Sequence, residues 1–365
     1  MQIQGQVLTP AGFQKATLHF SDCIEALRPA RSGKHYILPG FIDTHVHGGA
    51  GGDTMDGLEG IQTLRMFHAR HGTTTLLPTT ITNPWENIVS ALQAVKEAQG
   101  IWHGADVPGA HLEGPFISPG RLGAQPPFAL SPNPALLDEL LHIGVIRSTT
   151  VAPEIEGVTE SLPQLIEAGV RISIGHTRAD FQTTVDFIEK VVALGGTVAA
   201  THLYNAMGGL TGRDPSILGA VLVSKQVYTE VILDLHHVHP GSFELARQLK
   251  PEKLILITDA MRAAGLGDGE SDLGGQTVYV KNNRASLADG TIAGSLLTLD
   301  EALRNAVQLG VPLEEASRML SSTPARYLGL SDRGSIQKDK RADFVVLDDN
   351  LNVVDTLVGG RSIHE

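Results

Sequence analysis

Short runs of apolar, β-favouring residues alternate along most of the chain with segments whose apolar residues recur every three or four positions. The first pattern is typical of buried strands and the second of amphipathic helices. Eight strands are predicted, over residues 37–47, 73–80, 107–114, 145–153, 171–177, 197–205, 228–237 and 254–260. Helices fit between most of them, for example over residues 58–70, 84–98, 181–194 and 242–249.

Eight alternating strand and helix units favour an α/β fold of the closed (β/α)8 type, a TIM-like barrel, over an open doubly wound sheet. No Gly-x-Gly-x-x-Gly motif opens a helix after the first strand, which lowers the dinucleotide-binding alternative. After the eighth strand we expect a hairpin-bearing insertion over residues 274–295. Two further helices are predicted over residues 298–309 and 313–320.

The two ends of the chain share a different pattern, of short β-favouring pieces broken by Gly and Pro. Near the C-terminus, residues 342–348 and 352–358 are typical of two strands around an Asp/Asn turn. We therefore expect the termini to meet in one small, sandwich-like β-domain formed by residues 1–36 and 337–365. Residues 37–336 would then form the catalytic barrel.

Composition excludes several classes of protein. A hydrophobic content of 42% with mixed charges excludes disorder, and no apolar run approaches the roughly 20 residues of a membrane span. The N-terminus lacks the pattern of a signal peptide, and the single cysteine, Cys23, fits a reducing cytoplasm. The net charge of −12 argues against nucleic acid as a partner, so any site for an anion has to be built locally.

Polar residues gather where the predicted strands end. His45 and His47 are two residues apart, so their rings share one face of the first strand. This spacing is weak evidence alone, because 15 histidines in 365 residues supply about 0.6 such pairs by chance. Five later strands also end in histidine or an acid, namely at His111-Leu112-Glu113, His176, His202, His236-His237 and Asp259. Because active sites of such barrels lie at the C-terminal strand ends, this pattern predicts a metal site.

Histidine nitrogens and carboxylates that leave a coordination position open suit a hydrolytic ion such as Zn²⁺, which lowers the pKa of water towards ~7. Asp259 is the candidate to accept a proton from that water and pass it to a leaving group; the alternative for this residue is a helix N-cap. No Gly-x-Ser-x-Gly motif occurs, which disfavours acyl-enzyme chemistry.

Several segments resemble the N-acetylglucosamine-6-phosphate deacetylase family of the amidohydrolase superfamily. They cover nearly the whole chain in the expected order, and the most specific are residues 111–116 (HLEGPF) and 201–207 (THLYNAM). Others are residues 39–43, 175–177, 211–213, 258–260 and 342–347.

The resemblance implies removal of acetate from N-acetyl-D-glucosamine 6-phosphate to give D-glucosamine 6-phosphate. It implies that Glu113, His176 and His202 hold the main metal ion and that Asp259, also at the metal, is the general base and then the acid. This chain keeps His45 and His47, so a second ion sharing Glu113 is expected. The ion would be zinc, with iron or manganese as alternatives, since such ligand sets accept all three.

The resemblance also implies residues that bind the phosphorylated N-acetyl amino sugar. Arg213 would reach the active site of a neighbouring subunit in a homodimer; its alternative is a surface ion pair. Where many members have a histidine beside the reacting carbonyl, this chain has Gln125, which donates a hydrogen bond but brings no charge. The remaining sugar-binding positions are Ala124, Asn205, Ala206, His237, Ile292, Ala293 and Gly294.

Three alternatives compete with this prediction. The nearest is deacetylation of N-acetylgalactosamine 6-phosphate, which differs from the first sugar at one hydroxyl. A cyclic-amide hydrolase is disfavoured by the HLEGP and THLYNAM segments. A barrel that has lost catalysis and acts as an interaction scaffold is disfavoured by Asp259 together with the full set of metal-ligand candidates.

Overall fold

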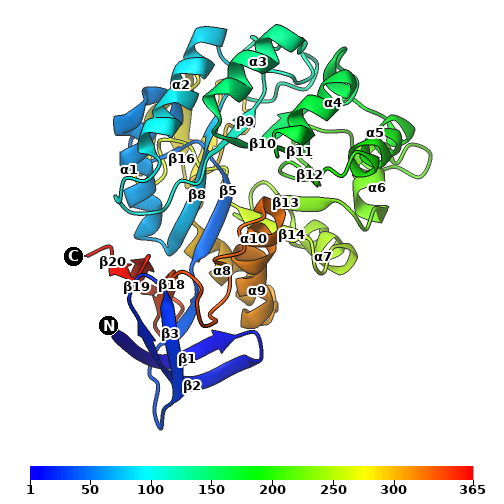
Figure 1. Cartoon of the computed structure of the whole chain (residues 1–365). Coiled ribbons are helices and arrows are strands. Elements are labelled where there is room, and N and C mark those ends of the chain that lie inside the picture. Colours follow the sequence, from blue (N-terminus) through cyan, green and yellow to red (C-terminus); the bar gives the residue numbers. More distant parts are fainter. Residues whose placement is uncertain (365) are drawn as a thin grey trace.

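The computed structural model describes residues 1–364 and contains an eight-stranded parallel barrel joined to a small β-domain (Figure 1). The barrel sheet has the order β14-β13-β12-β11-β10-β9-β8-β5. Its strands are β5 (Phe41–Val46), β8 (Thr73–Thr80), β9 (Ala110–Glu113), β10 (Ile146–Val151), β11 (Arg171–Ile174), β12 (Val198–Ala200), β13 (Tyr228–Ile232) and β14 (Leu254–Ile257). The predicted TIM-like barrel is confirmed.

The barrel is closed by hydrogen bonds between β5 and the segment that follows β14. The Asp259 amide donates to the carbonyl of His45 at 2.9 Å, and the His47 amide donates to the carbonyl of Ala260 at 2.9 Å. Below them, the Thr258 hydroxyl donates to the Asp43 carboxylate at 2.6 Å. Closure therefore brings the first and last predicted site segments together.

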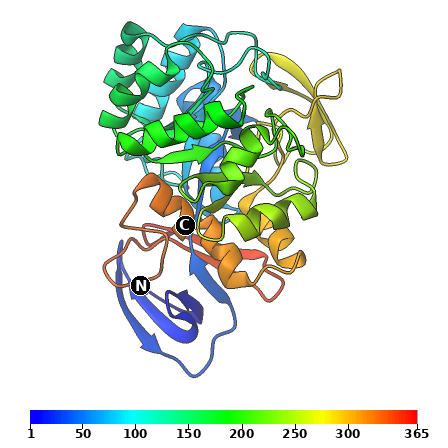
Figure 2. The same cartoon turned by 90° about the vertical axis from the view of Figure 1, so that its right-hand side faces the viewer.

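Helices cover the outside of the barrel, and Figure 2 shows them as a layer around the strands. They are α1 (Leu58–Ala69), α2 (Trp85–Ala98), α3 (Pro134–Ile143), α4 (Val158–Glu167), α5 (Phe181–Ala193), α6 (Ser216–Val223), α7 (Pro240–Leu249), α8 (Leu299–Gln308), α9 (Leu313–Leu320) and α10 (Ser322–Leu328). All six helices predicted by range are present. The apolar periodicity of α4 is kept although Pro163 lies inside it, whereas α6 is almost entirely buried and shows little periodicity.

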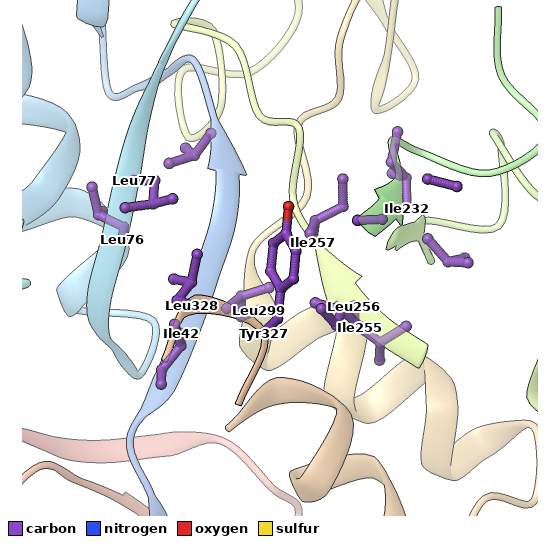
Figure 3. Packing of buried hydrophobic residues seen from close by; sticks show 14 of the residues in the cluster. Ile42, Leu76, Leu77, Ile232, Ile255, Leu256, Ile257, Leu299, Tyr327 and Leu328 are labelled. Atoms are coloured by element: carbon purple, nitrogen blue, oxygen red, sulfur yellow. The ribbon is translucent and has the colours of Figure 1, made fainter. Parts of the chain in front are cut away.

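The N-terminal end of the barrel is filled by apolar side chains (Figure 3). Ile42 of β5 and Ile257 of β14 lie on either side of Tyr327 from α10, and all three are fully buried. The Tyr327 hydroxyl lies 2.8 Å from the hydroxyl of Ser148, so the one polar atom of this side chain has a partner inside the barrel. This packing leaves only the opposite, C-terminal end open to a ligand.

The small β-domain is a seven-stranded sheet built from both ends of the chain, as expected. Its order is β20-β19-β18-β4-β1-β2-β3. Its own apolar core includes Leu18, Ile37 and an edge-to-face contact between Phe20 and Phe344 with ring centroids 5.3 Å apart. The strands are β1 (Gln2–Thr9), β2 (Gly12–Phe20), β3 (Ile24–Pro29), β4 (Tyr36–Pro39), β18 (Phe344–Leu347), β19 (Val353–Val358) and β20 (Arg361–Ser362).

The first predicted strand, over residues 37–47, is wrong in one respect, because it is two strands in two different sheets. β4 pairs with β1 and β18 in the small domain, whereas β5 pairs with β8 in the barrel. Gly40 alone separates them. A Cβ atom at Gly40 would lie 2.2 Å from the hydroxyl oxygen of Thr74, so only glycine fits this close crossing.

Short elements complete the C-terminal face of the barrel. β6 (Gly48–Gly49), β7 (Gly52–Asp53) and the 3-10 helix η1 (Thr54–Asp56) follow β5. The insertion predicted over residues 274–295 is a three-stranded sheet that begins earlier, with β15 (Gly269–Leu273), β16 (Gln276–Lys281) and β17 (Arg284–Ser286). Within residues 1–364, no helix combines the length and apolar character needed to cross a bilayer.

Candidate metal centre and active site

The predicted metal-ligand residues meet at the C-terminal ends of the barrel strands. His45 lies in β5 and Glu113 ends β9, while the other four residues lie one or two positions after the end of a strand. Those four are His47 after β5, His176 after β11, His202 after β12 and Asp259 after β14. All six are buried, each with at most 9% of its surface exposed.

Glu113 stands at the centre of the cluster. Its Oε1 lies 3.1 Å from Nε2 of His202 and 3.2 Å from Nε2 of His176. The same oxygen lies 3.5 Å from Nε2 of His45, and Oε2 lies 3.2 Å from Nε2 of His47. One carboxylate therefore faces four imidazole nitrogens from three other strand ends.

Asp259 approaches the same point from the last strand. Its Oδ1 lies 3.3 Å from Nε2 of His47 and 3.5 Å from Nε2 of His45. The carboxylates of Glu113 and Asp259 thus flank the histidine pair. Asp259 does not cap a helix, because the next helix, α8, begins only at Leu299.

Hydrogen bonds at Nδ1 orient the imidazole rings of His47 and His176. Nδ1 of His47 lies 3.1 Å from the Thr79 carbonyl, and Nδ1 of His176 lies 2.9 Å from the Arg121 carbonyl. Because a carbonyl only accepts, Nδ1 carries the proton in each ring, and Nε2 presents a lone pair to the cluster. Nε2 of His176 lies only 3.1 Å from Nε2 of His202. Two facing nitrogens at this distance can share a proton or a cation, and a metal ion would satisfy both lone pairs.

The charges in the cluster also favour a bound cation. Burial lowers the pKa of His45 and His47, but Glu113 and Asp259 outweigh it, so the pKa of His45 is well above its ordinary value and that of His47 is about 9. Burial raises the pKa of both carboxyls, yet the imidazoles hold the pKa of Glu113 well below its usual range and that of Asp259 at about 2. Both acids are thus ionised and attract a cation.

Two overlapping donor sets fit a divalent ion: His45, His47 and Glu113 in one, and Glu113, His176 and His202 in the other. The donor atoms of each set lie within 4.8 Å of one another. Imidazole and carboxylate donors suit zinc and related ions, and the only cysteine, Cys23, lies outside the barrel.

The backbone at three of these residues is strained. His176, His202 and Asp259 have φ values of +47°, +29° and +50°, in the left-handed region that residues with a side chain seldom adopt. Each such residue costs on the order of 1–3 kcal/mol, which the surrounding structure has to offset. This cost is typical of positions where side-chain direction matters more than local stability.

A cavity of about 290 Å³ opens above the cluster, close to the lower end of the range for small-molecule sites. His47, Glu113, His176, His202 and Asp259 line it. Predicted sugar-binding residues that also line it are Ala124, Gln125, Asn205, Ala206, His237, Ile292 and Gly294. A larger hollow of about 620 Å³ over α1 contains none of the metal-ligand residues, so chemistry rather than size identifies the site.

Three predicted residues do not line this cavity. His45 and Ala293 are fully buried next to it, and Arg213 lies in the exposed loop between β12 and α6. Sequence reasoning missed Ile81 and Leu273, which form an apolar wall of the cavity. Ile81 and Leu273 carry no polar group that marks a site, and they pack in a small core below the β15–β17 sheet.

Gln125 has both ends of its amide engaged. Its Oε1 accepts a hydrogen bond from the Thr82 amide at 2.7 Å, and its Nε2 donates to Oε2 of Glu113. One N–H of the amide remains for a ligand. His237 is held by Asp234, whose Oδ2 lies 2.6 Å from Nδ1 of the ring, so Nε2 remains available in the cavity.

Histidines and carboxylates at the C-terminal rim of a parallel barrel, beside a β-domain made from both termini, define the class of metal-dependent barrel hydrolases. The model of the amidohydrolase family matches residues 36–363. This chain therefore belongs to the amidohydrolase family, and it is a hydrolase.

Its relatives in that family are sugar-phosphate deacetylases. N-acetylgalactosamine-6-phosphate deacetylase of Escherichia coli O157:H7 is 40% identical, with 89% of this chain and 87% of the relative covered. N-acetylglucosamine-6-phosphate deacetylase of Lysinibacillus sphaericus is 40% identical, with 90% and 86% covered. A solved structure of N-acetyl-D-glucosamine-6-phosphate deacetylase from Mycobacterium smegmatis, a mutant in complex with N-acetyl-D-glucosamine-6-phosphate, is 33% identical with a TM-score of 0.93, covering 100% of this chain and 99% of that one.

Proposed function

We propose that this enzyme hydrolyses the acetamide of N-acetyl-D-glucosamine 6-phosphate, giving acetate and D-glucosamine 6-phosphate. The observation that carries the proposal is the meeting of Glu113, His176, His202 and Asp259 at the floor of one small cavity. The relatives named above support the choice of substrate class.

Glu113, His176 and His202 would hold one divalent ion, and His45 and His47 would hold a second that shares Glu113. Zinc is the best match, with iron or manganese as alternatives. When bound, such an ion polarises a carbonyl and lowers the pKa of water towards about 7. The protein's own contribution is to fix the rings and the carboxylates before the substrate arrives.

Asp259 would move the proton. Its carboxylate accepts a proton from the water that attacks the acetamide carbon, then donates it to the sugar nitrogen as the C–N bond breaks. The neighbouring imidazoles lower the pKa of this acid to about 2, so its carboxylate is ionised before the substrate binds. Water thus supplies a hydroxyl to the acetyl group and a proton to the amine, so the reaction balances.

The sugar phosphate would bind along the rest of the cavity wall. Asn205 and the backbone of Ala206 would contact the phosphate, and His237 the sugar. Ala124, Gln125, Ile292, Ala293 and Gly294 would contact the remainder of the ligand. Arg213 is exposed and outside the cavity of its own chain, which fits a residue that reaches a partner's cavity in a homodimer.

The central test measures acetate release from N-acetylglucosamine 6-phosphate by protein of known metal content, beside Asp259→Asn. We expect kcat of Asp259→Asn to fall by about 10²–10⁴ while its metal content stays close to that of the unmodified protein. Asp300→Asn is the matched control, because Asp300 is also a buried acid but pairs with His71 and Arg304 outside the cavity. Equal activity of Asp259→Asn and the unmodified enzyme would contradict the proposal.

The alternative substrate is N-acetylgalactosamine 6-phosphate, which the relative from Escherichia coli O157:H7 favours. The ratio of kcat/KM for the two sugars decides between them. If neither sugar releases acetate after metal reconstitution, the proposed deacetylation is wrong; if the purified protein also binds no metal, the scaffold alternative is favoured. A cytoplasmic location stays a prediction from the cysteine count.

A further inference from the structure

Glu230 is an acidic residue in the middle of β13 whose side chain is fully buried inside the barrel. Its only ion-pair partner within residues 1–364 is His45, with Oε2 lying 3.3 Å from Nδ1. Its other oxygen, Oε1, accepts a hydrogen bond from the Thr44 hydroxyl at 2.6 Å. A buried carboxylate is costly, and Glu230 has no role in the proton transfer described above.

The contact with Glu230 determines which nitrogen of His45 can bind a metal. An ionised carboxylate only accepts, so the Nδ1 of His45 carries a proton and donates it to Glu230. Nε2 then presents its lone pair to the donor set, where it lies 3.3 Å from Nε2 of His47 and 3.5 Å from Glu113. Glu230 thus does for His45 what carbonyl groups do for His47 and His176.

His111 also contacts β5, through the backbone of Thr44. Its Nδ1 lies 3.1 Å from the carbonyl of Thr44, which can only accept, so its Nε2 accepts from the hydroxyl of Thr150 at 2.7 Å. That hydroxyl lies 2.9 Å from the hydroxyl of Thr201. The donor atoms of His45, His111 and Glu230 also lie within 4.8 Å of one another. Because both nitrogens of His111 are used in hydrogen bonds, we assign this group to the support of β5.

We propose that Glu230 is a positioning residue that sets the occupancy of the ion held by His45 and His47. The effect is specific to that ion, because the rings of His176 and His202 lie in hydrogen-bonding distance of Glu113 and, for His176, of the Arg121 carbonyl, whereas the ring that pairs with Glu230 is that of His45. This inference rests on the metal-dependent function proposed above, but it concerns ion binding and not catalysis. Partners of this kind change metal affinity by about 10- to 100-fold when they are replaced.

The test is a zinc titration of the full chain, with bound metal measured after equilibrium dialysis and no substrate present. We expect the unmodified protein to bind two ions, and Glu230→Gln to bind the second about 10- to 100-fold more weakly while the first is unchanged. Tyr327→Phe is the matched control, because it also removes a buried hydrogen bond inside the barrel but touches neither donor set. It should bind both ions like the unmodified protein.

Thr44→Val is the second variant, in case Glu230→Gln does not fold. It keeps the shape of residue 44 and removes the hydroxyl that holds Oε1 of Glu230, so it should weaken the same ion by a smaller factor. Unchanged affinity for both ions in the variants that fold, or equal weakening of both ions, would overturn the inference. Binding of only one ion by the unmodified protein at saturating zinc would also overturn the inference. That enzyme could still release acetate, so the acetate assay distinguishes failure of this inference from failure of the proposed function.

Discussion

A single residue, Glu113, faces four imidazoles at the bottom of the cavity. A neutral amide at this position would leave the closely spaced nitrogens of His176 and His202 without their common carboxylate partner. The orientation of the Glu113 carboxylate therefore matters. Gln125 fixes this orientation, because its amide links Oε2 of Glu113 to the backbone amide of Thr82. Gln125 thus acts on Glu113 as well as facing the ligand.

We predict that Gln125→Ala lowers kcat by about 10-fold or more and changes KM less. The lost amide both positions Glu113 and leaves an N–H for the developing negative charge on the carbonyl oxygen, and these contributions matter most in the transition state. Steady-state kinetics with N-acetylglucosamine 6-phosphate measures both constants. Gln276→Ala is a useful control, because Gln276 bonds the carbonyl of Ala124 and does not contact the metal ligands. An unchanged kcat in Gln125→Ala would remove this residue from the mechanism.

At the scale of elements, the connection between α10 and the small β-domain is tied to the barrel by one buried arginine. Nη1 of Arg333 lies 2.7 Å from the carboxylate of Asp106 and 2.9 Å from the hydroxyl of Thr75 in β8. Arg341 reaches the same carboxylate at 3.3 Å. This cluster links residues before β18 to the second strand of the barrel.

Arg333→Met should lower the free energy of unfolding by about 2–3 kcal/mol, because it removes charge-assisted hydrogen bonds from a group that is 8% exposed. Arg341 stays beside Asp106 and limits the loss. Guanidinium unfolding followed by circular dichroism measures the change. Arg326→Met, which breaks an exposed pair with Glu252, should cost at most about 1 kcal/mol. If Arg333→Met lowered the free energy of unfolding by as little as Arg326→Met, the predicted contribution of Arg333 would be contradicted.

Lys250, at the end of α7, joins two helices. Its amine donates to the carbonyl of Ser224, the residue that ends α6, and its side chain is buried. Burial lowers the pKa of Lys250 to about 8. In the unfolded chain the pKa of a lysine is about 10.4. Between pH 8 and pH 10.4 Lys250 therefore binds more protons in the unfolded chain than in the folded one, so its contribution to the free energy of unfolding rises with pH.

We therefore predict that the stability of the unmodified protein, relative to Lys250→Met, rises between pH 8 and pH 10.5 by at most about 3 kcal/mol. Below pH 8 the difference between the two proteins should stay constant. Urea unfolding at a series of pH values measures it. Lys281→Met, at an exposed strand end, should show no such trend. A flat difference for Lys250→Met across this range would contradict the lowered pKa.

At the scale of the whole molecule, the barrel and the rim of metal ligands could be predicted because both repeat along the chain. Most strands contain an apolar run, and six of the eight end in a histidine or an acid at the rim where ligands gather. Glu230 escaped prediction because a lone acid within Tyr228–Ile232 is indistinguishable from a solvent-facing position. Ile81 and Leu273 escaped because apolar cavity walls follow the same pattern as the core. The division at Gly40 depends on a crossing with Thr74 that no local pattern encodes.

The pairing of β4 with β18 has a consequence for how the protein is made. A ribosome delivers β4 and β5 long before it delivers Phe344–Leu347, which pairs along one edge of β4. Since Gly40 is the sole residue between β4 and β5, the nascent polypeptide keeps the start of its barrel without that support until β18 has been made. A truncated product lacking its last twenty-odd residues would therefore expose the edge of β4 beside an otherwise finished catalytic half.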